Sequence, residues 1–212
     1  MGRPRLLDLF CGAGGAAMGY YRAGFDVVGV DLEPQKHYPF EFHQADAMTY
    51  PLDGFDVIHA SPPCQAYTTA GKQWRKQGKE YPDLIAVIRS RLDPYNLPYV
   101  IENVPGAPLI DPILLNGPMF GLKVRRRRYF ETKPRLDFIL IPPDPPSQYR
   151  MGRRVSEGDV ITPVGHFSNV VYAKKVMGID WMGQKDLAQA IPPAYTEFIG
   201  KQLMERIQKG EK

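Results

Sequence analysis

The sequence predicts an α/β fold in which helices cover both faces of a mostly parallel β-sheet. Three observations predict this fold class. Short apolar runs alternate with stretches of helical periodicity, which is the order typical of parallel sheets. The runs are apolar at successive positions, as strands buried on both faces require. In this 212-residue chain, 43% of the residues are hydrophobic, enough for the core of one domain of ordinary size.

Five strands and two helices are expected in the first half of the chain. The strands are residues 6–10, 27–31, 40–46, 57–60 and 99–103, and the helices are about 16–23 and 83–92. A sixth strand is expected at 125–130, followed by a Pro-rich stretch without a clear signal up to about residue 167. A last helix begins near Pro193, with Ile199, Leu203 and Ile207 four residues apart.

Four polar or glycine-containing segments fall where the expected strands end. They are residues 10–15, Asp31, residues 61–65 and residues 102–103. In open α/β sheets, ligands bind beyond the carboxyl ends of the strands. We therefore expect these segments to form one site.

The first of these segments is a glycine loop that suits a nucleoside-containing cofactor. Gly12 and Gly14 lie between a strand and a helix, where the backbone can approach a ligand closely. Asp31 can accept hydrogen bonds from ribose hydroxyls, and Asp46 from an adenine amino group. Because Gly12-x-Gly14-x-x-Ala17 also fits a dinucleotide fingerprint, these residues alone leave NAD open. The alternative is a purely structural role, in which a tight turn needs glycine for its geometry.

A single thiol lies on a rigid loop at the same sheet edge. In Ser61-Pro62-Pro63-Cys64-Gln65 the two prolines fix the backbone around Cys64, the candidate nucleophile. The alternative is a small buried hydrophobic side chain, the commonest role of a lone cysteine. Cys11, inside the glycine loop, receives that structural interpretation.

An acid and an arginine run complete the candidate chemistry. Glu102 ends a strand, where a carboxyl group can hydrogen-bond a ring nitrogen and an amino group and assist protonation. In the expected strand at 125–130, Arg126 and Arg128 share one face, so this pair can point into the cleft. A solvated strand-end acid and a solvated basic face are the alternatives.

The overall charge indicates affinity for a polyanion. The net charge is +4, and residues 123–135 hold seven bases against one acid, whereas residues 25–60 hold seven acids against one base. No apolar run reaches the ~18 residues of a membrane span, and two cysteines cannot form a disulfide framework. The four histidines lack metal-ligand spacing and receive no catalytic role. We expect a cytoplasmic protein without a metal.

Taken in order, these segments resemble the DNA cytosine-5 methyltransferase family. The strings that carry the resemblance are DLFCGAGG, SPPCQ, ENV, an R-x-R pair and a final IPP-x-x-x-x-x-IG. The resemblance covers residues 6 to about 203, with a gap between about 133 and 172. It implies a Rossmann-like methyltransferase fold and transfer of a methyl group from S-adenosylmethionine to C5 of cytosine in DNA.

The resemblance also assigns roles to individual residues. The catalytic residues it implies are Cys64, Glu102, Arg126 and Arg128. The cofactor-binding residues are Phe10, Gly12, Gly14, Asp31, Leu32, Asp46, Ala47, Pro63, Ala190 and Ile191. The substrate-binding residues are Gln65, Asn103, Val104, Lys72 and Arg75.

The chain departs from the family pattern mainly between the arginine pair and the final segment. We expect a catalytic domain at 1–132, a reduced recognition-like segment at 133–172, and a C-terminal segment at 173–212 that packs back on the catalytic domain. Some forty residues are too few for an independent core. A short, relaxed cytosine context, a homodimer or a specificity partner is therefore expected. A small, truncated member of the family also suits a bacterial or phage-encoded context. Smaller departures are Val124, where the family usually has glutamine, and Ala188-Gln189, where it usually has Gly-Asn.

Two other functions stay open at this point. One branch of the same family methylates cytosine in transfer RNA, and a reduced recognition segment suits such a substrate. A catalytically inactive nucleic-acid-binding relative is the other alternative. The intact cysteine loop and Glu102 favour an active enzyme.

Overall fold

The computed structural model describes residues 2–68, 77, 82–136 and 156–210. They form a seven-stranded sheet in the order β3-β2-β1-β4-β5-β7-β6. Neighbouring strands from β3 to β5 pair in parallel, whereas β7 is antiparallel to both β5 and β6. The strands are β1 (Arg5–Leu9), β2 (Asp26–Asp31), β3 (Glu41–Gln44), β4 (Val57–Ala60), β5 (Tyr99–Asn103), β6 (Ile113–Leu115) and β7 (Arg128–Lys133).

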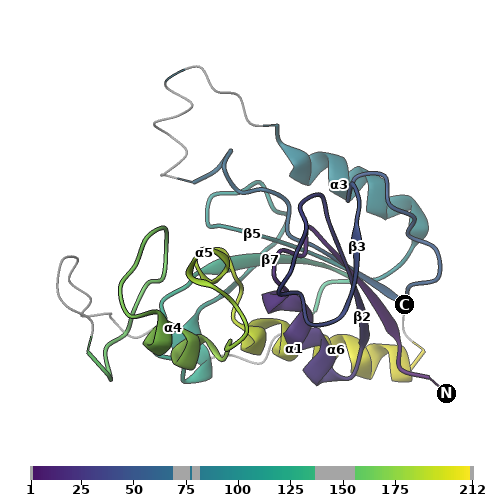
Figure 1. Cartoon of the computed structure of the whole chain (residues 1–212). Coiled ribbons are helices and arrows are strands. Elements are labelled where there is room, and N and C mark those ends of the chain that lie inside the picture. Colours follow the sequence, from purple (N-terminus) through teal and green to yellow (C-terminus); the bar gives the residue numbers. More distant parts are fainter. Residues whose placement is uncertain (1, 69–76, 78–81, 137–155, 211–212) are drawn as a thin grey trace.

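Helices cover both faces of the sheet, as Figure 1 shows. The helix α3 (Leu84–Leu92) lies on one face, over Leu7, Ile58 and Ile101. On the other face lie α1 (Gly15–Ala23) and α6 (Pro193–Gln208). Because side chains of a strand alternate between faces, each strand of the central sheet contributes to both apolar cores. The predicted fold class is confirmed.

A smaller lobe contacts the chain just before β7 and the loop that follows β1, at the carboxyl ends of the parallel strands. It contains α4 (Val170–Met177) and α5 (Gln184–Leu187). Outside the lobe, two short 3-10 helices follow α3 and β6, namely η1 (Asp93–Tyr95) and η2 (Gly117–Phe120). The lobe has its own apolar cluster, which includes the buried side chains of Val124 and Ile161. The backbones of these two residues pair in an isolated β-bridge. The expected segment boundary between residues 172 and 173 falls inside α4.

The strand predicted at 125–130 is wrong in its bounds. It begins only at Arg128 and runs to Lys133, and the short strand β6 was not predicted. Residues 125–127 approach the sheet as extended chain, because the Arg125 N–H donates to Ile161 in the smaller lobe. The third strand ends at Gln44, so Asp46 lies in the loop after it.

The close approach of α1 and α6 depends on a glycine. A Cβ atom built on Gly19 lies 2.0 Å from Thr196 Oγ1 and 2.2 Å from the Pro193 carbonyl oxygen. The Thr196 hydroxyl donates a hydrogen bond of 2.8 Å to the Ala16 carbonyl, which ties the two helices together. This contact brings the C-terminal segment, including Ile191, against the glycine loop.

The helices within the described ranges are too short or too polar to cross a membrane.

Candidate active site

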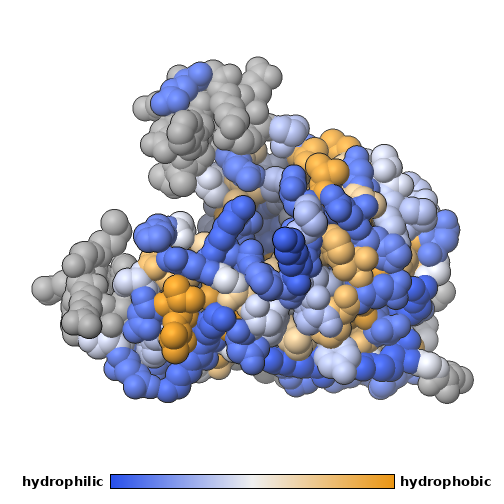
Figure 2. Space-filling view, viewed as in Figure 1, coloured by the Kyte–Doolittle hydropathy of each residue, from blue (hydrophilic) through white to orange (hydrophobic). Residues whose placement is uncertain are grey.

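The predicted segments meet at the carboxyl edge of the parallel strands. β1 ends just before Phe10, β2 ends at Asp31, β4 is followed by Ser61, and β5 ends at Asn103. In the space-filling view, the face that contains this edge is hollowed near its centre, and hydrophilic residues predominate around the hollow (Figure 2). The expected convergence of these segments is therefore what the structure shows.

The glycine loop has the conformation that its glycines permit. Gly12 and Gly14 adopt φ angles of 48° and 83°, in the left-handed region where a side chain is strained. A Cβ atom on Gly12 would meet nothing within 4 Å, so space is open beside this residue. The Gly12 N–H donates to Asp31 Oδ2 (3.0 Å), which places the acid against the loop. A nucleoside cofactor fits this loop, which offers open space, an acid for a ribose and a helix N-terminus.

The C-terminal part of the chain closes the loop from behind. The Trp181 indole N–H donates a hydrogen bond of 2.9 Å to the Ala13 carbonyl. A Cβ atom on Gly15 would lie 2.5 Å from the Ile191 carbonyl oxygen, so the two backbones touch. The segment of Ala190 and Ile191 thus reaches the loop, as the resemblance implied.

The remaining predicted cofactor residues lie around the same edge. Leu32 is 67% exposed, directly after β2. Asp46 is exposed, and its Oδ1 accepts a hydrogen bond from the Met48 N–H, whereas Ala47 is buried. The Phe10 side chain is half-buried at the end of β1, and Pro63 is exposed beside Cys64.

The Cys64 loop is fixed by a buried amide. The Asn103 side-chain N–H₂ donates to the Pro62 carbonyl (2.9 Å), and its oxygen accepts from the Val104 N–H. After Cys64 the chain turns, because the Cys64 carbonyl accepts from the N–H groups of Tyr67 and Thr68. Asn103 therefore holds the loop in place, while Gln65 and Val104 lie at its rim. Lys72 and Arg75 are outside the described residues.

Cys64 and Cys11 differ in their surroundings. Burial raises the pKa of the Cys64 thiol and the charge of Glu102 adds to the rise, whereas the nearby Arg128 and Arg126 guanidinium groups oppose it. Burial also raises the pKa of Cys11, and the neighbouring acids Asp8 and Asp31 add to the effect. Cations accompany only Cys64, which supports a nucleophilic role for this residue and a structural one for Cys11.

Glu102 and Arg128 form a buried ion pair. The Arg128 Nε lies 2.9 Å from Glu102 Oε1, and the side chains of the pair are 15% and 8% exposed. Glu102 is opposite Phe130 in the antiparallel pairing, so Arg128, two residues before Phe130, projects from the same face. Burial raises the pKa of Glu102, while Arg128 opposes the shift. Ser61 and Arg126 oppose it as well, so burial eases the protonation of a carboxyl group that its neighbours stabilise in the ionised form.

Arg126 has mainly structural contacts. It is 3% exposed, and its guanidinium donates to the carbonyl oxygens of Pro163 (2.9 Å) and Ala188 (2.8 Å). Burial lowers the pKa of Arg126 to about 9, and the charge of Arg128 acts in the same direction. Arg126 connects the catalytic edge to the smaller lobe, so of the arginine pair only Arg128 forms an ion pair with Glu102 among the described contacts.

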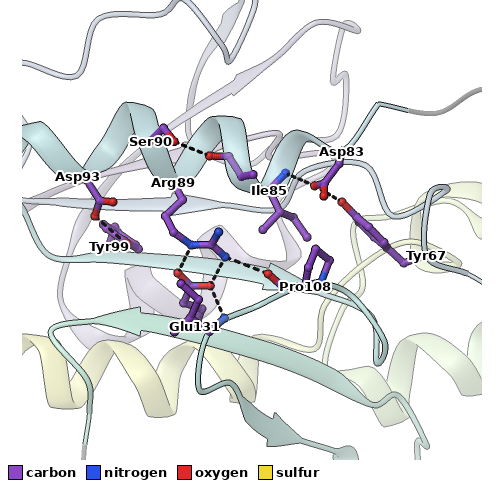
Figure 3. A network of polar contacts seen from close by, with 11 residues as sticks. Tyr67, Asp83, Ile85, Arg89, Ser90, Asp93, Tyr99, Pro108 and Glu131 are labelled. Carbon is purple, nitrogen blue, oxygen red and sulfur yellow. Dashed lines mark hydrogen bonds and ion pairs between the residues drawn. The ribbon is translucent and has the colours of Figure 1, made fainter.

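A second ion pair fixes β7 from the opposite face of the sheet, as Figure 3 shows. The Arg89 guanidinium of α3 donates through Nε and Nη2 to the two carboxylate oxygens of Glu131, and each donor–acceptor distance is 2.7 Å. The Ile110 N–H also donates to Glu131, and Arg89 donates to the Pro108 carbonyl. This bidentate pair fixes the register of β7 against β5 and hence Arg128 against Glu102.

Sequence reasoning missed several residues that shape the site. His59 and Ser61 lie directly beneath Glu102, and Trp181 reaches the glycine loop from 168 residues away. The one available signal was a histidine inside the otherwise apolar strand Val57–Ala60. Glu131 and Trp181 gave none, because their partners are distant in the sequence. Within the described ranges, no group of three or more His, Cys, Asp or Glu side chains is arranged to hold a metal ion.

The fold is that of a Rossmann-like methyltransferase. The structure of the methyltransferase EhMeth of Entamoeba histolytica superposes with a TM-score of 0.63 over 99% of both chains, at 15% sequence identity, a likeness of fold alone. Residues 4–108 match the family model of C-5 cytosine-specific DNA methylases. Through this part, the chain belongs to that family.

Two curated relatives agree with this family. The chain is 38% identical over 85 residues to the Type II methyltransferase M1.HphI of Haemophilus parahaemolyticus, an alignment that covers 31% of this chain and 22% of that protein. It is 30% identical over 119 residues to the Type II methyltransferase M.NgoMIV of Neisseria gonorrhoeae, covering 50% and 36%. The alignments thus span between about a fifth and a third of these relatives.

The ion pair of Arg128 makes a prediction about the Cys64 thiol. Because the Arg128 charge opposes the rise of the Cys64 pKa, Arg128→Met should move the pH midpoint of Cys64 alkylation by iodoacetamide to higher pH. Arg127→Met, at the exposed neighbouring position, should leave the midpoint in place. The midpoint reports the pKa, whereas altered access changes only the plateau rate. Equal midpoints in wild type and Arg128→Met would rule out the assigned electrostatic role.

Proposed function

We propose that this protein transfers a methyl group from S-adenosylmethionine to C5 of cytosine in DNA through a covalent bond between Cys64 and C6. The observation that carries this proposal is the meeting of Cys64, Glu102 and Arg128 beside the glycine loop at one sheet edge. The membership of the family supports the reaction class. Neither a dinucleotide site nor a simple binding module explains a thiol, an acid and an arginine in this arrangement.

The glycine loop and Asp31 would hold the cofactor, with Phe10 and Leu32 beside it. When bound, S-adenosylmethionine supplies an electrophilic methyl group on its sulfonium. The N-terminus of α1 has no side-chain cap and no acid in its first turn, so its N–H groups suit the cofactor carboxylate. Asp31 stays an acceptor for ribose hydroxyls, because each carboxylate oxygen has a lone pair beyond the backbone N–H that it binds.

The chain's own residues then account for the chemistry at the base. The Cys64 thiolate attacks C6 of cytosine, which makes C5 electron-rich enough to take the methyl group. Burial raises the pKa of Glu102, so Glu102 takes up a proton more readily than an exposed acid; the protonated form then donates to N3 and stabilises the adduct. Arg128 keeps both groups in place and favours the thiolate. Solvent then takes the C5 proton, the C5–C6 double bond forms again as the thiolate leaves C6, and N3 returns its proton to Glu102, which restores the aromatic ring.

Reaching C6 requires the target base to leave the stack. In a duplex the ring face is covered by neighbouring bases, so the enzyme must flip the cytosine into its pocket. The basic residues of the chain would supply salt-dependent contacts with phosphates. Sequence-specific contacts would depend on the segment at 133–172, of which residues 137–155 lie outside the described residues.

Mass spectrometry of nucleosides tests this proposal. The protein is incubated with S-adenosylmethionine that carries a deuterated methyl group, together with unmethylated duplex DNA and, separately, transfer RNA. We expect deuterated 5-methyl-deoxycytidine from DNA, with Glu102→Gln strongly impaired. Product from transfer RNA alone would favour the RNA alternative, and no label in either would favour an inactive relative.

A further inference from the structure

A row of buried polar side chains lies beneath the Glu102 carboxylate. The Tyr20 hydroxyl is 2.9 Å from His59 Nδ1, and His59 Nε2 is 2.9 Å from Ser61 Oγ. In the register of β4 against β5, Ala60 is opposite Ile101, which places Ser61 beside Glu102, and the Ser61 side chain acts as a hydrogen-bond partner that lowers the pKa of Glu102. Tyr20 in α1 and His59 in β4 are both 0% exposed, so this row connects the helix layer to the catalytic edge.

The donors in this row can be assigned from the ionised end. In the protein without substrate Glu102 is paired with Arg128 as a carboxylate, which only accepts, so the Ser61 hydroxyl donates to Glu102 and its oxygen accepts from His59 Nε2–H. Burial lowers the pKa of His59 to about 3, so its ring is neutral at physiological pH. The neutral ring then offers Nδ1 as an acceptor for the Tyr20 hydroxyl. All three hydrogen bonds therefore point toward Glu102.

We propose that His59 is a positioning residue that fixes the Ser61 hydroxyl as a hydrogen-bond donor to Glu102. A serine hydroxyl alone is a free rotor that can turn to other acceptors. His59 removes that freedom by occupying the serine oxygen with its Nε2–H, and Tyr20 selects the required tautomer. The proposal rests on the proposed function only in that Glu102 is the acid that contacts the base.

The charged groups around this row determine the expected effect on Glu102. Arg128 and Arg126 face Glu102 from β7 and from the chain before it, and Cys64 lies nearby. Asp8 of β1 is opposite His59 of β4 in the strand register. Burial raises the pKa of Asp8 well above the usual range, which favours the neutral form of this acid. Ser61 thus belongs, with the arginines, to the groups that stabilise the ionised Glu102 against burial. Loss of its donor should raise the pKa of Glu102.

A merely structural histidine is the competing explanation. His59 would then satisfy Tyr20 and Ser61 within the core, and its replacement would lower stability without a specific effect on Glu102. Two measurements on the protein without DNA or cofactor separate the alternatives. Their outcome therefore does not depend on whether the protein transfers methyl groups. The positioning role of His59 and the proposed function can each fail without the other.

The first measurement is the state of the His59 ring by nitrogen-15 NMR of histidine-labelled protein. The chain has four histidines, and His59→Gln identifies the signal of His59. We expect a neutral Nε2–H tautomer that stays unchanged from about pH 8 to pH 5, because the pKa of His59 is depressed. The opposite tautomer, or a protonated ring in this range, would overturn the proposal.

The second measurement is the titration of Glu102, followed through its carbon-13-labelled carboxyl group and identified with Glu102→Gln. Ser61→Ala should move the titration to higher pH, and His59→Leu should move it in the same direction. His59→Gln should stay close to wild type, since its side-chain N–H₂ can still donate to Ser61. The double variant His59→Leu/Ser61→Ala should match Ser61→Ala alone, because His59 acts through Ser61. A folded His59→Leu with an unchanged titration, or additive shifts in the double variant, would refute the positioning role.

Discussion

Cys64→Ser should lower the rate of methyl transfer by about 10³-fold or more, because a serine hydroxyl is a far weaker nucleophile than a thiolate. The substitution is nearly isosteric, and the loop is held through Asn103 and the backbone rather than through the thiol. The melting temperature and the affinity for S-adenosylmethionine should therefore stay close to those of wild type. Single-turnover kinetics and calorimetry on the same protein preparations measure these quantities.

The size of this effect depends on the role assigned to Cys64. If Cys64 only filled space, replacement by serine would cost little activity, and a rate within tenfold of wild type would count against the mechanism. Glu102→Gln provides a second reference point, since it removes the acid but leaves the thiol. Its rate should also fall, while Cys64 should remain open to alkylation.

Gly19→Ala should destabilise the protein by about 3 kcal/mol, although helix propensity alone predicts a gain of about 1 kcal/mol. The new methyl group would lie 2.0 Å from Thr196 Oγ1 and 2.2 Å from the Pro193 carbonyl oxygen. The carbonyl belongs to the backbone, so it moves only if α6 shifts away from α1. For a chain of this length, the loss corresponds to a melting temperature lower by about 6–12 °C.

Two other glycines provide a graded control for this prediction. A Cβ atom on Gly200 would lie 2.8 Å from the Ala23 Cβ atom, a tight contact with a side chain, whereas one on Gly2 would meet nothing within 4 Å. The loss of stability should therefore fall in the order Gly19→Ala, Gly200→Ala, Gly2→Ala. Thermal unfolding followed by circular dichroism gives the ranking. A Gly19→Ala variant as stable as wild type would show that the two helices are not closely packed.

Local patterns in the sequence predicted the parallel part of the fold. The strands β1, β2, β4 and β5 are apolar runs that are followed by polar or glycine-containing segments. Both the positions of these strands and their carboxyl ends could therefore be predicted from the sequence. The antiparallel strands β6 and β7 were missed or misplaced, because the arginine run at 125–128 masks the point where extended chain becomes strand. β7 is also held by the ion pair of Glu131 with Arg89, a residue 42 positions away in the sequence.

The candidate site was predictable where one short segment carries one chemical group. Cys64, Glu102 and Asp31 each follow a strand, and the topology brings them together. The roles of Arg126, Asn103 and His59 were not readable, because they depend on partners far away in the sequence. Arg126 was expected in the cleft, yet its guanidinium binds the carbonyl oxygens of Pro163 and Ala188.

The most direct test of covalent cytosine-5 methylation is a trap with 5-fluorocytosine in duplex DNA. After methyl transfer, fluorine at C5 prevents the proton loss that releases the enzyme, so the Cys64–C6 bond should persist. We predict a complex that survives a denaturing gel, depends on S-adenosylmethionine, and yields a modified peptide that contains Cys64. Cys64→Ser should form no such complex. Efficient methylation of ordinary cytosine without a trapped complex, or a trapped complex that Cys64→Ser still forms, would contradict the mechanism.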